Sequence, residues 1–119
     1  MFAANAQSSD SPTILIFGDS LSAGYGLEVD QSWTNLLQLR LAQQGYEHRV
    51  VNASISGETT EGGATRIDAA LQDFAPALVI IELGGNDGLR GLPIEVTGKN
   101  LSSMIEQSQS AGAAVNFPF

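Results

Sequence analysis

Three short apolar runs, each followed by a turn, most strongly constrain what this chain can fold into. The runs are residues 13–17, 49–55 and 78–83, and glycine directly follows the first and the third. A short, continuously apolar run is typical of a strand that is buried on both faces of a parallel sheet. The pattern therefore predicts three buried strands.

Segments with helical periodicity lie between the runs and after the last one. In residues 32–44, 65–74 and 93–111, apolar side chains recur three and four positions apart, which places them on one face of a helix. Gly45 lies where the first segment should stop, and Pro76 ends the second. Strand and helix alternate, so the sequence predicts right-handed crossover units and an α/β fold with a parallel sheet.

A single domain is expected over residues 13–115. Residues 1–12 are a polar lead-in that should be disordered, and residues 1–7 fit either a trimmed export signal or a flexible tail without a role. Residues 113–115 could open a fourth strand, and residues 116–119 form an atypical tail. The architecture looks incomplete, with the last strands and helices of such a fold missing.

Composition excludes several classes of function. The chain has 13 acidic against five basic side chains and a formal charge of -8, which argues against nucleic acid as a partner. No stretch approaches the roughly 18 consecutive apolar residues that a membrane-spanning helix needs. The lack of cysteine removes disulfides and thiolate chemistry, and neither a metal-ligand cluster nor a dinucleotide fingerprint implies a cofactor.

The turns that follow the three runs are the places to look for a site. Ligands of an open parallel sheet bind outside the carboxyl ends of its strands, and these turns should meet at that edge. They comprise residues 18–22, 56–59 and 84–88. We therefore expect all three to converge on one site.

The residues of these turns suit attack by a hydroxyl group. A nucleophile needs an exposed position on a tight turn and donors for the negative oxygen that develops on the substrate. Ser20 offers the hydroxyl, Gly57 a backbone N–H that no Cβ obstructs, and Asn86 a side-chain amide. Taken singly, each is also an ordinary turn residue, and it is their joint occurrence at successive strand ends that favours a catalytic site.

Together these turns resemble the motifs of the GDSL (SGNH) family of serine esterases. Gly18-Asp19-Ser20-Leu21 is similar to the GDSL motif, Gly57 to the family's isolated glycine, and Gly84-Gly85-Asn86-Asp87 to its GxND motif. The surrounding runs resemble the bacterial periplasmic arylesterase, lysophospholipase and acyl-thioesterase branch. The resemblance covers residues 13 to about 114.

The resemblance implies a flavodoxin-like three-layer α/β/α sandwich and hydrolysis of carboxylic esters or thioesters through an acyl-enzyme. Ser20 would be the nucleophile, and its own N–H, Gly57 and Asn86 would hold the oxyanion. Asp19 would brace the nucleophile turn and Asp87 would organise the loop at Asn86. Residues 88–93 would form a mobile loop over the acyl pocket, and the protein would be periplasmic or secreted.

The chain departs from the family pattern in its catalytic base. The family carries base and acid in an Asp-x-x-His motif, and this sequence contains none. Its single histidine, His48, precedes the second predicted strand and should lie at the opposite edge of the sheet from Ser20, a strand length of roughly 17 to 20 Å away. We therefore expect the chain to be nearly inert, because the general base and acid are not present in it.

An incomplete sheet would also leave an apolar strand edge exposed at residues 78–83, which favours self-association. A fragment or prematurely terminated copy explains this chain most simply, and a neighbouring copy that supplies the missing part is the alternative. Two other readings of its function remain: a module that binds a flavin or phosphate, and a non-catalytic remnant. The first turn lacks the glycine pattern of a phosphate-binding loop, and the local charge is acidic.

Overall fold

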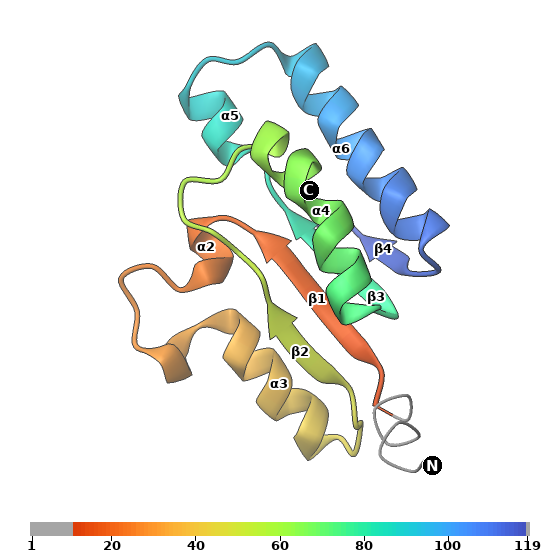
Figure 1. Cartoon of the computed structure of the whole chain (residues 1–119). Helices are drawn as coiled ribbons and strands as arrows, with labels where there is room; N and C mark the ends of the chain where they lie inside the picture. The colour runs from red at the N-terminus through yellow and green to blue at the C-terminus, as the bar shows by residue number, and fades with distance from the viewer. Residues whose placement is uncertain (1–10, 119) are drawn as a thin grey trace.

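The computed structural model describes residues 11–118, which form one parallel sheet covered by helices on both faces (Figure 1). The strands lie in the order β2-β1-β3-β4, which is the strand order of flavodoxin-like doubly wound sheets. The predicted α/β class is confirmed. The strands are β1 (Thr13–Gly18), β2 (Arg49–Asn52), β3 (Leu78–Glu82) and β4 (Ala114–Asn116).

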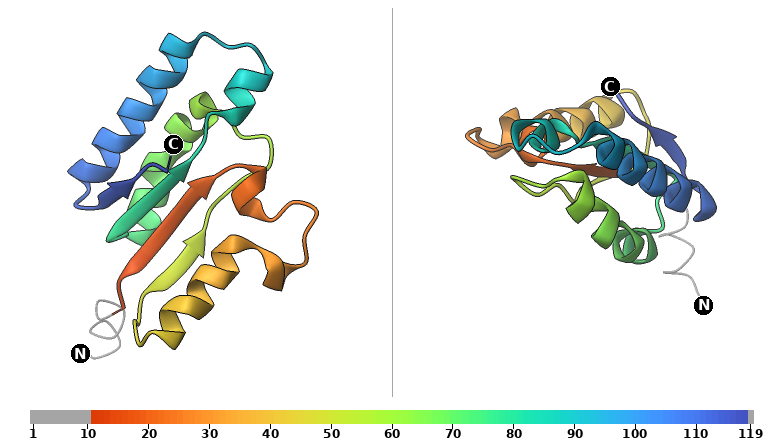
Figure 2. Two further views of the ribbon diagram at one scale, coloured as in Figure 1. Left: turned by 180° about the vertical axis from the view of Figure 1, so that it is seen from behind. Right: turned by 90° about the horizontal axis from the view of Figure 1, so that it is seen from above.

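Three long helices make the crossover connections. Helix α3 lies on one face of the sheet, α4 lies on the other, and α6 packs against α4 (Figure 2). None of the helices within residues 11–118 is long and apolar enough to cross a membrane. The helical segments are α2 (Ser20–Ala23), the short 3-10 helix η1 (Val29–Gln31), α3 (Trp33–Gln43), α4 (Thr60–Phe74), α5 (Gly85–Leu89) and α6 (Ile94–Ser110).

The core lies around β1, which is central in the sheet and buried along its whole length. Its neighbours on either side run parallel to it, with Leu15 opposite Val51 of β2 and Val79 of β3. Apolar side chains from β1 and β3 pack against α4 and α6, and burying each of the larger ones contributes roughly 1.5 to 3 kcal/mol. The fully buried members of this cluster are Leu15, Phe17, Ile67, Val79, Ile81 and Met104.

Strand β2 corrects one prediction. The run 49–55 was expected to form a strand buried on both faces, but β2 ends at Asn52 and its residues are exposed or half-buried. The reason is its position, because an edge strand has only one neighbour and α3 covers it in part. Beyond β2 the chain still follows β1, with the N–H of Ile55 donating to the Gly18 carbonyl at 3.0 Å.

Helix α4 begins earlier than the predicted segment 65–74, at Thr60. Thr59 is its N-cap and accepts a hydrogen bond from the Gly62 N–H at 3.3 Å. Periodicity misses this first turn because two adjacent glycines suggest a break. Gly63 is required there: a Cβ would lie 2.7 Å from a methyl carbon of Leu83, so only glycine lets α4 approach the sheet this closely.

The exposed edge predicted at residues 78–83 is also corrected. Strand β4 pairs with β3 in parallel, with Leu78 opposite Ala114 and Ile80 opposite Asn116. Over this stretch the outer edge of the sheet is therefore β4. Self-association through the sheet edge stays a prediction. The expectation for residues 1–7 falls outside the described residues, and so does most of the predicted lead-in.

Candidate active site

The nucleophile turn joins β1 to the short helix α2. Asp19 is the N-cap of α2, and its carboxylate accepts a hydrogen bond from the Leu21 N–H at 3.0 Å. Ser20 is the first residue of the helix and is half-buried, whereas Asp19 is only 4% exposed. Asp19 thus braces the turn, and Ser20 lies on the tight strand-to-helix turn that a nucleophile requires.

A buried carboxyl that the sequence analysis missed holds this turn from β3. The hydroxyl of Ser22 donates to Glu82 Oε1 at 2.7 Å, and the Asp19 N–H donates to the same atom at 3.3 Å. Ser22 in turn accepts a hydrogen bond from Trp33 Nε1 at 3.2 Å. The Glu82 side chain therefore holds Asp19, before Ser20, and Ser22, after it.

Burial raises the pKa of the Glu82 carboxyl, and the negative charge of the neighbouring Asp19 adds to the rise, although the hydrogen bond from Ser22 opposes it. The sequence signal for Glu82 was available, since it is the single charged residue in the run 78–83. A charged side chain at the end of a buried strand is costly to bury without a hydrogen-bond partner, so a partner is expected among the loops at the carboxyl ends of the strands.

The second loop presents Gly57 on a tight turn. The N–H of Glu58 donates to the Ile55 carbonyl at 3.1 Å, and Gly57 within this turn has φ of 83°. No atom lies within 4 Å of the position that a Cβ on Gly57 would take, so the backbone conformation, not space, requires glycine. Within residues 11–118 no acceptor takes the Gly57 N–H, which leaves this donor available to a ligand.

The third loop carries Asn86 into contact with the second. Asn86 Nδ2 donates to the carbonyl of Glu58 at 2.9 Å, and Glu58 is the residue directly after Gly57 in the chain. A carboxamide nitrogen has two hydrogens, so this bond uses one and leaves the other for a ligand. The loops of Gly57 and Asn86 therefore form one unit.

Asp87 fastens this unit to the helices. Its carboxylate accepts from the Thr60 N–H at 2.8 Å, the Thr60 hydroxyl at 2.5 Å and the Thr97 hydroxyl at 2.8 Å. It is 2% exposed. Burial alone would raise the pKa of Asp87, but the hydrogen bonds from Thr60 and Thr97 outweigh burial and the net pKa is lowered. These contacts fit the loop-organising role that the resemblance implies.

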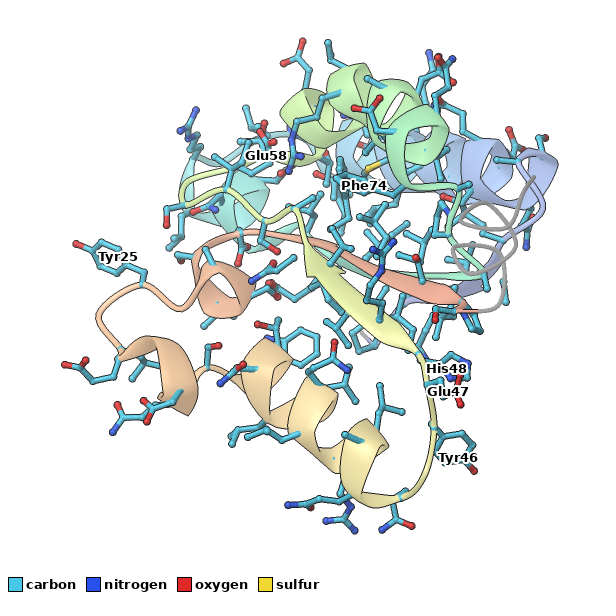
Figure 3. The ribbon with its side chains drawn as sticks, turned by 60° about the horizontal axis from the view of Figure 1, so that its bottom comes forward. Tyr25, Tyr46, Glu47, His48, Glu58 and Phe74 are labelled. Carbon is cyan, nitrogen blue, oxygen red and sulfur yellow. The ribbon has the colours of Figure 1, made fainter. Side chains whose placement is uncertain are left out.

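The three loops meet at the carboxyl edge of the sheet. Besides the bond from Ile55 to the Gly18 carbonyl, the Gly18 N–H donates to the Ser54 hydroxyl at 3.1 Å. The nucleophile turn is thereby tied to the Gly57 loop, and that loop to Asn86. His48 directly precedes β2, whose first residue, Arg49, is opposite Thr13 at the start of β1, so His48 lies at the amino end of the sheet and Ser20 at its carboxyl end, as the sequence predicts. In Figure 3, His48 lies far from Glu58.

An apolar cavity of about 360 Å³ opens beside the nucleophile turn. Its apolar lining comes from α2, the residue after β3, α6 and the residue after β4, and its polar lining includes Asp19 and Glu82. The segment 88–93 lies elsewhere: its first two residues belong to α5, and Leu89 is 87% exposed. Its role as a mobile loop over an acyl pocket stays a prediction. The apolar lining residues are Leu21, Leu83, Leu101 and Phe117.

A doubly wound parallel sheet with a Gly-Asp-Ser-Leu turn after its central strand defines the SGNH class of hydrolase folds. A family model described as the GDSL-like lipase/acylhydrolase family matches residues 16–118. The chain belongs to this family. Its flavodoxin-like fold and its resemblance to GDSL esterases are therefore confirmed.

Named relatives support the same assignment. The chain is 52% identical over 109 residues to esterase TesA of Pseudomonas aeruginosa, covering 92% of this chain and 54% of that protein. It is 43% identical over 101 residues to thioesterase 1/protease 1/lysophospholipase L1 of Escherichia coli, covering 85% and 47%. The chain thus spans about half the length of the curated relatives it matches.

A solved structure agrees in detail. The psychrotrophic esterase EstA from Pseudoalteromonas, in a crystal structure inhibited by monoethylphosphonate, matches with a TM-score of 0.85 at 45% identity. The match covers 90% of this chain and 58% of that one. The fold of residues 11–118 is accordingly that of one part of a larger hydrolase domain.

Proposed function

We propose that this chain carries the nucleophile and the oxyanion donors of a serine hydrolase that acts on carboxylic esters or thioesters. The observation that carries the proposal is the bond from Asn86 Nδ2 to the Glu58 carbonyl, because it joins the carboxamide to the residue that follows Gly57, whose N–H has no acceptor within residues 11–118. The names of the relatives supply the substrate class, ester or thioester.

The chemistry follows from the three loops. Ser20 Oγ attacks the acyl carbon, and the carbonyl oxygen takes up negative charge as the new C–O bond forms. The N–H groups of Ser20 and Gly57 and the second hydrogen of Asn86 Nδ2 stabilise that oxygen. The alcohol or thiol then departs with a proton, and water releases the acid from the acyl-enzyme.

The proton of Ser20 needs a base, which this chain does not provide. Its one histidine, His48, is at the opposite edge of the sheet, and no Asp-x-x-His motif occurs in the sequence. Ser20 therefore stays a neutral hydroxyl, and we propose that the chain alone turns over esters at close to the background rate.

Phosphonylation tests the site without requiring turnover. Because the oxyanion donors and binding alone retain part of the rate enhancement, a large excess of a fluorophosphonate should label Ser20 slowly, but ahead of the other serines, even without the base. Intact-mass and peptide analysis should find one label that is absent from Ser20→Ala. Ser102→Ala, which alters an exposed serine of α6, is the matched control and should label as the unaltered chain does. Label that persists in Ser20→Ala, or that spreads evenly over the serines, would refute the assignment.

The rival interpretation is a module that binds flavin or phosphate through the same loops. Titration with FMN separates the two, since a binding module would change the flavin spectrum at micromolar protein, whereas the hydrolase site would not. Saturable FMN binding that competes with phosphonylation of Ser20 would favour the rival.

A further inference from the structure

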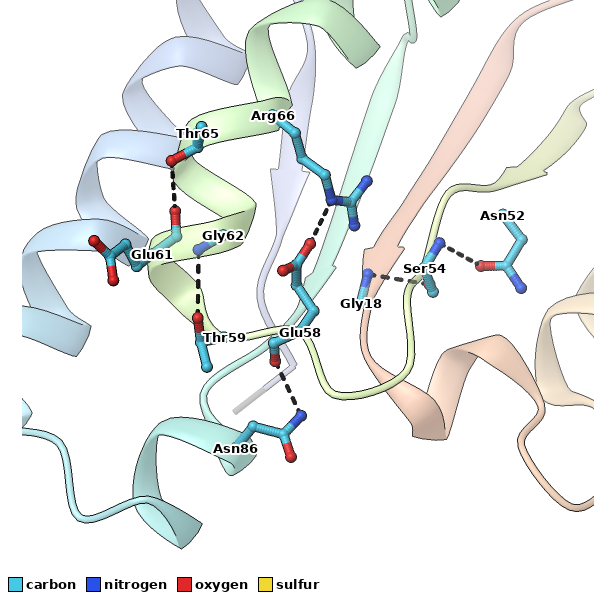
Figure 4. A network of polar contacts seen from close by, with 10 residues as sticks. All are labelled: Gly18, Asn52, Ser54, Glu58, Thr59, Glu61, Gly62, Thr65, Arg66 and Asn86. Carbon is cyan, nitrogen blue, oxygen red and sulfur yellow. Dashed lines mark hydrogen bonds and ion pairs between the residues drawn. The ribbon is translucent and has the colours of Figure 1, made fainter.

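Glu58 connects the two oxyanion donors Gly57 and Asn86 through its backbone, and Figure 4 shows its contact with Asn86. Its N–H closes the turn that contains Gly57 by donating to Ile55, and its carbonyl accepts from Asn86. The orientation of one residue therefore determines where the Gly57 N–H and the Asn86 carboxamide point.

The side chain of Glu58 is anchored on helix α4. Its carboxylate forms an ion pair with Arg66 Nε, and the two side chains are 13% and 26% exposed, respectively. The guanidinium of Arg66 lies over the ring of Phe17, 4.0 Å from its centroid, shortly before the nucleophile turn in β1. The anchor thus reaches from the Gly57 loop to the strand that leads into the nucleophile turn.

Gly62 makes room for this side chain. A Cβ at Gly62 would lie 2.1 Å from Glu58 Oε1, so any other residue would push the carboxylate away. Glycine is a poor helix former, yet Gly62 stands in the first turn of α4. Helix α4 therefore has a residue of low helix propensity, Gly62, at the position beside the Glu58 carboxylate.

The Gly57 turn needs such an anchor. Glycine adopts positive and negative φ about equally well, so the peptide that presents its N–H can rotate at little cost. Fixing Glu58 at the end of the turn restricts that rotation. Fixed donors stabilise a developing negative charge without having to reorganise during the reaction.

We propose that Glu58 is a positioning residue, which Arg66 holds in the space left by Gly62 so that the Gly57 N–H and the Asn86 carboxamide face one oxyanion. The inference rests on the proposed function of these two donors. Glu58 acts through them and has no contact with the reacting atoms.

Gly62→Ala is the most direct test, with Gly98→Ala as its matched control. Both replace a helical glycine by a better helix former, but no atom lies within 4 Å of a Cβ at Gly98. Only Gly62→Ala should displace Glu58. It should shift the NMR signals of the Gly57 amide and the Asn86 carboxamide, whereas Gly98→Ala should leave both signals unchanged.

Phosphonylation of Ser20 supplies the second measurement. We expect Gly62→Ala to slow labelling at least tenfold, a fraction of the roughly 10²- to 10³-fold cost of losing one oxyanion donor. Its melting temperature should not fall, so a merely structural role of Glu58 would not produce this pattern. The double variant Glu58→Gln/Gly62→Ala should label no more slowly than Gly62→Ala, because both changes act on one carboxylate.

Glu58→Gln provides an independent variant, with Glu61→Gln, an exposed residue in the first turn of α4, as its control. It should shift the same two NMR signals. Unchanged signals of Gly57 and Asn86 in both Gly62→Ala and Glu58→Gln would overturn the positioning role. If the signals shift but Ser20 of the unaltered chain labels no faster than the exposed Ser102, the positioning role stands and the proposed hydrolase function fails.

Discussion

The Glu82 carboxylate accepts a hydrogen bond from the Ser22 hydroxyl at 2.7 Å, which ties the last residue of β3 to the helix that begins at Ser20. Because the same oxygen also accepts from the Asp19 N–H, the nucleophile turn is held from a neighbouring strand and not only by its own cap. The shape of the site is in this sense a property of the sheet.

Gly18→Ala should destabilise the protein by roughly 1 to 3 kcal/mol, the usual cost of overpacking. Its new Cβ would lie 2.7 Å from Glu82 Oε1 and 2.8 Å from Ser22 Oγ. Urea denaturation measures the loss. Gly88→Ala in α5 is the control, since no atom lies within 4 Å of a Cβ there. Equal stability of the two variants would show that the Glu82 contact is not close-packed.

The raised pKa of Glu82 predicts a pH dependence that Glu82→Gln removes. A carboxyl whose pKa is higher in the folded protein retains its proton longer there, so its contribution to stability is full below the unfolded pKa and is lost as pH rises through the folded pKa. The stability of the unaltered chain minus that of Glu82→Gln should therefore decline above about pH 4.3.

Urea denaturation at a series of pH values measures this difference. Glu106→Gln, an exposed change on α6, should give a difference that stays flat over the same range. A difference that rises with pH would mean that Glu82 is stabilised in its charged form.

Asp87→Ala should cost roughly 2 to 4 kcal/mol. Hydrogen bonds to a charged group contribute roughly 1.5 to 3 kcal/mol each, and part of their sum is offset because the variant no longer buries a charge. Asp73→Ala, an exposed change on α4, should stay within about 0.5 kcal/mol. Since the pKa of Asp87 is lowered, its contribution is present above the unfolded pKa and is lost as pH falls through the folded pKa. Denaturation at neutral and acid pH should show the cost shrinking in acid.

Asn86→Ala should slow phosphonylation of Ser20 by about 10² or more, the scale of one oxyanion donor. The loss of its bond to the Glu58 carbonyl should reduce the free energy of unfolding by only about 1 kcal/mol. Asn35→Ala on α3 serves as the control and should label normally. Normal labelling of Asn86→Ala would remove Asn86 from the site.

Hydrolysis of p-nitrophenyl acetate or butyrate by this chain should lie close to the buffer background, and Ser20→Ala should give the same rate. The physical reason is the missing imidazole, without which the Ser20 hydroxyl keeps its proton. Spectrophotometric release of p-nitrophenol measures both. Robust turnover that Ser20→Ala abolishes would show that another group accepts the proton.

Local patterns predicted the elements that depend on local signals. The apolar runs at β1 and β3 and the periodic segments at α3 and α6 lie within a few residues of the observed bounds. The start of α4 was missed because Gly62 and Gly63 suggest a break, whereas their reason is tertiary: one makes room for Glu58 and the other for Leu83.

Some residues of the site could likewise be predicted from local patterns, and others could not. Turn positions at strand ends indicated Ser20, Gly57 and Asn86, because parallel topology alone brings such turns to one edge. The contact of Glu82 escaped prediction because its partner Ser22 lies 60 positions away in sequence. The Glu58 to Arg66 pair escaped it because Glu58 precedes α4 and Arg66 lies within that helix, so helical spacing does not relate them. The burial of β2 was overestimated because an apolar run does not reveal whether its strand is central or at an edge.

The position of β1 has a consequence for how the protein is made. Of the four strands within residues 11–118 it is synthesised before the others, yet it is an interior strand of the sheet and pairs with β3, which is synthesised much later. Such non-local pairing is slow to form and leaves apolar surface uncovered meanwhile. The turn that bears Ser20 can therefore take its final shape only after the segment ending at Glu82 has been translated.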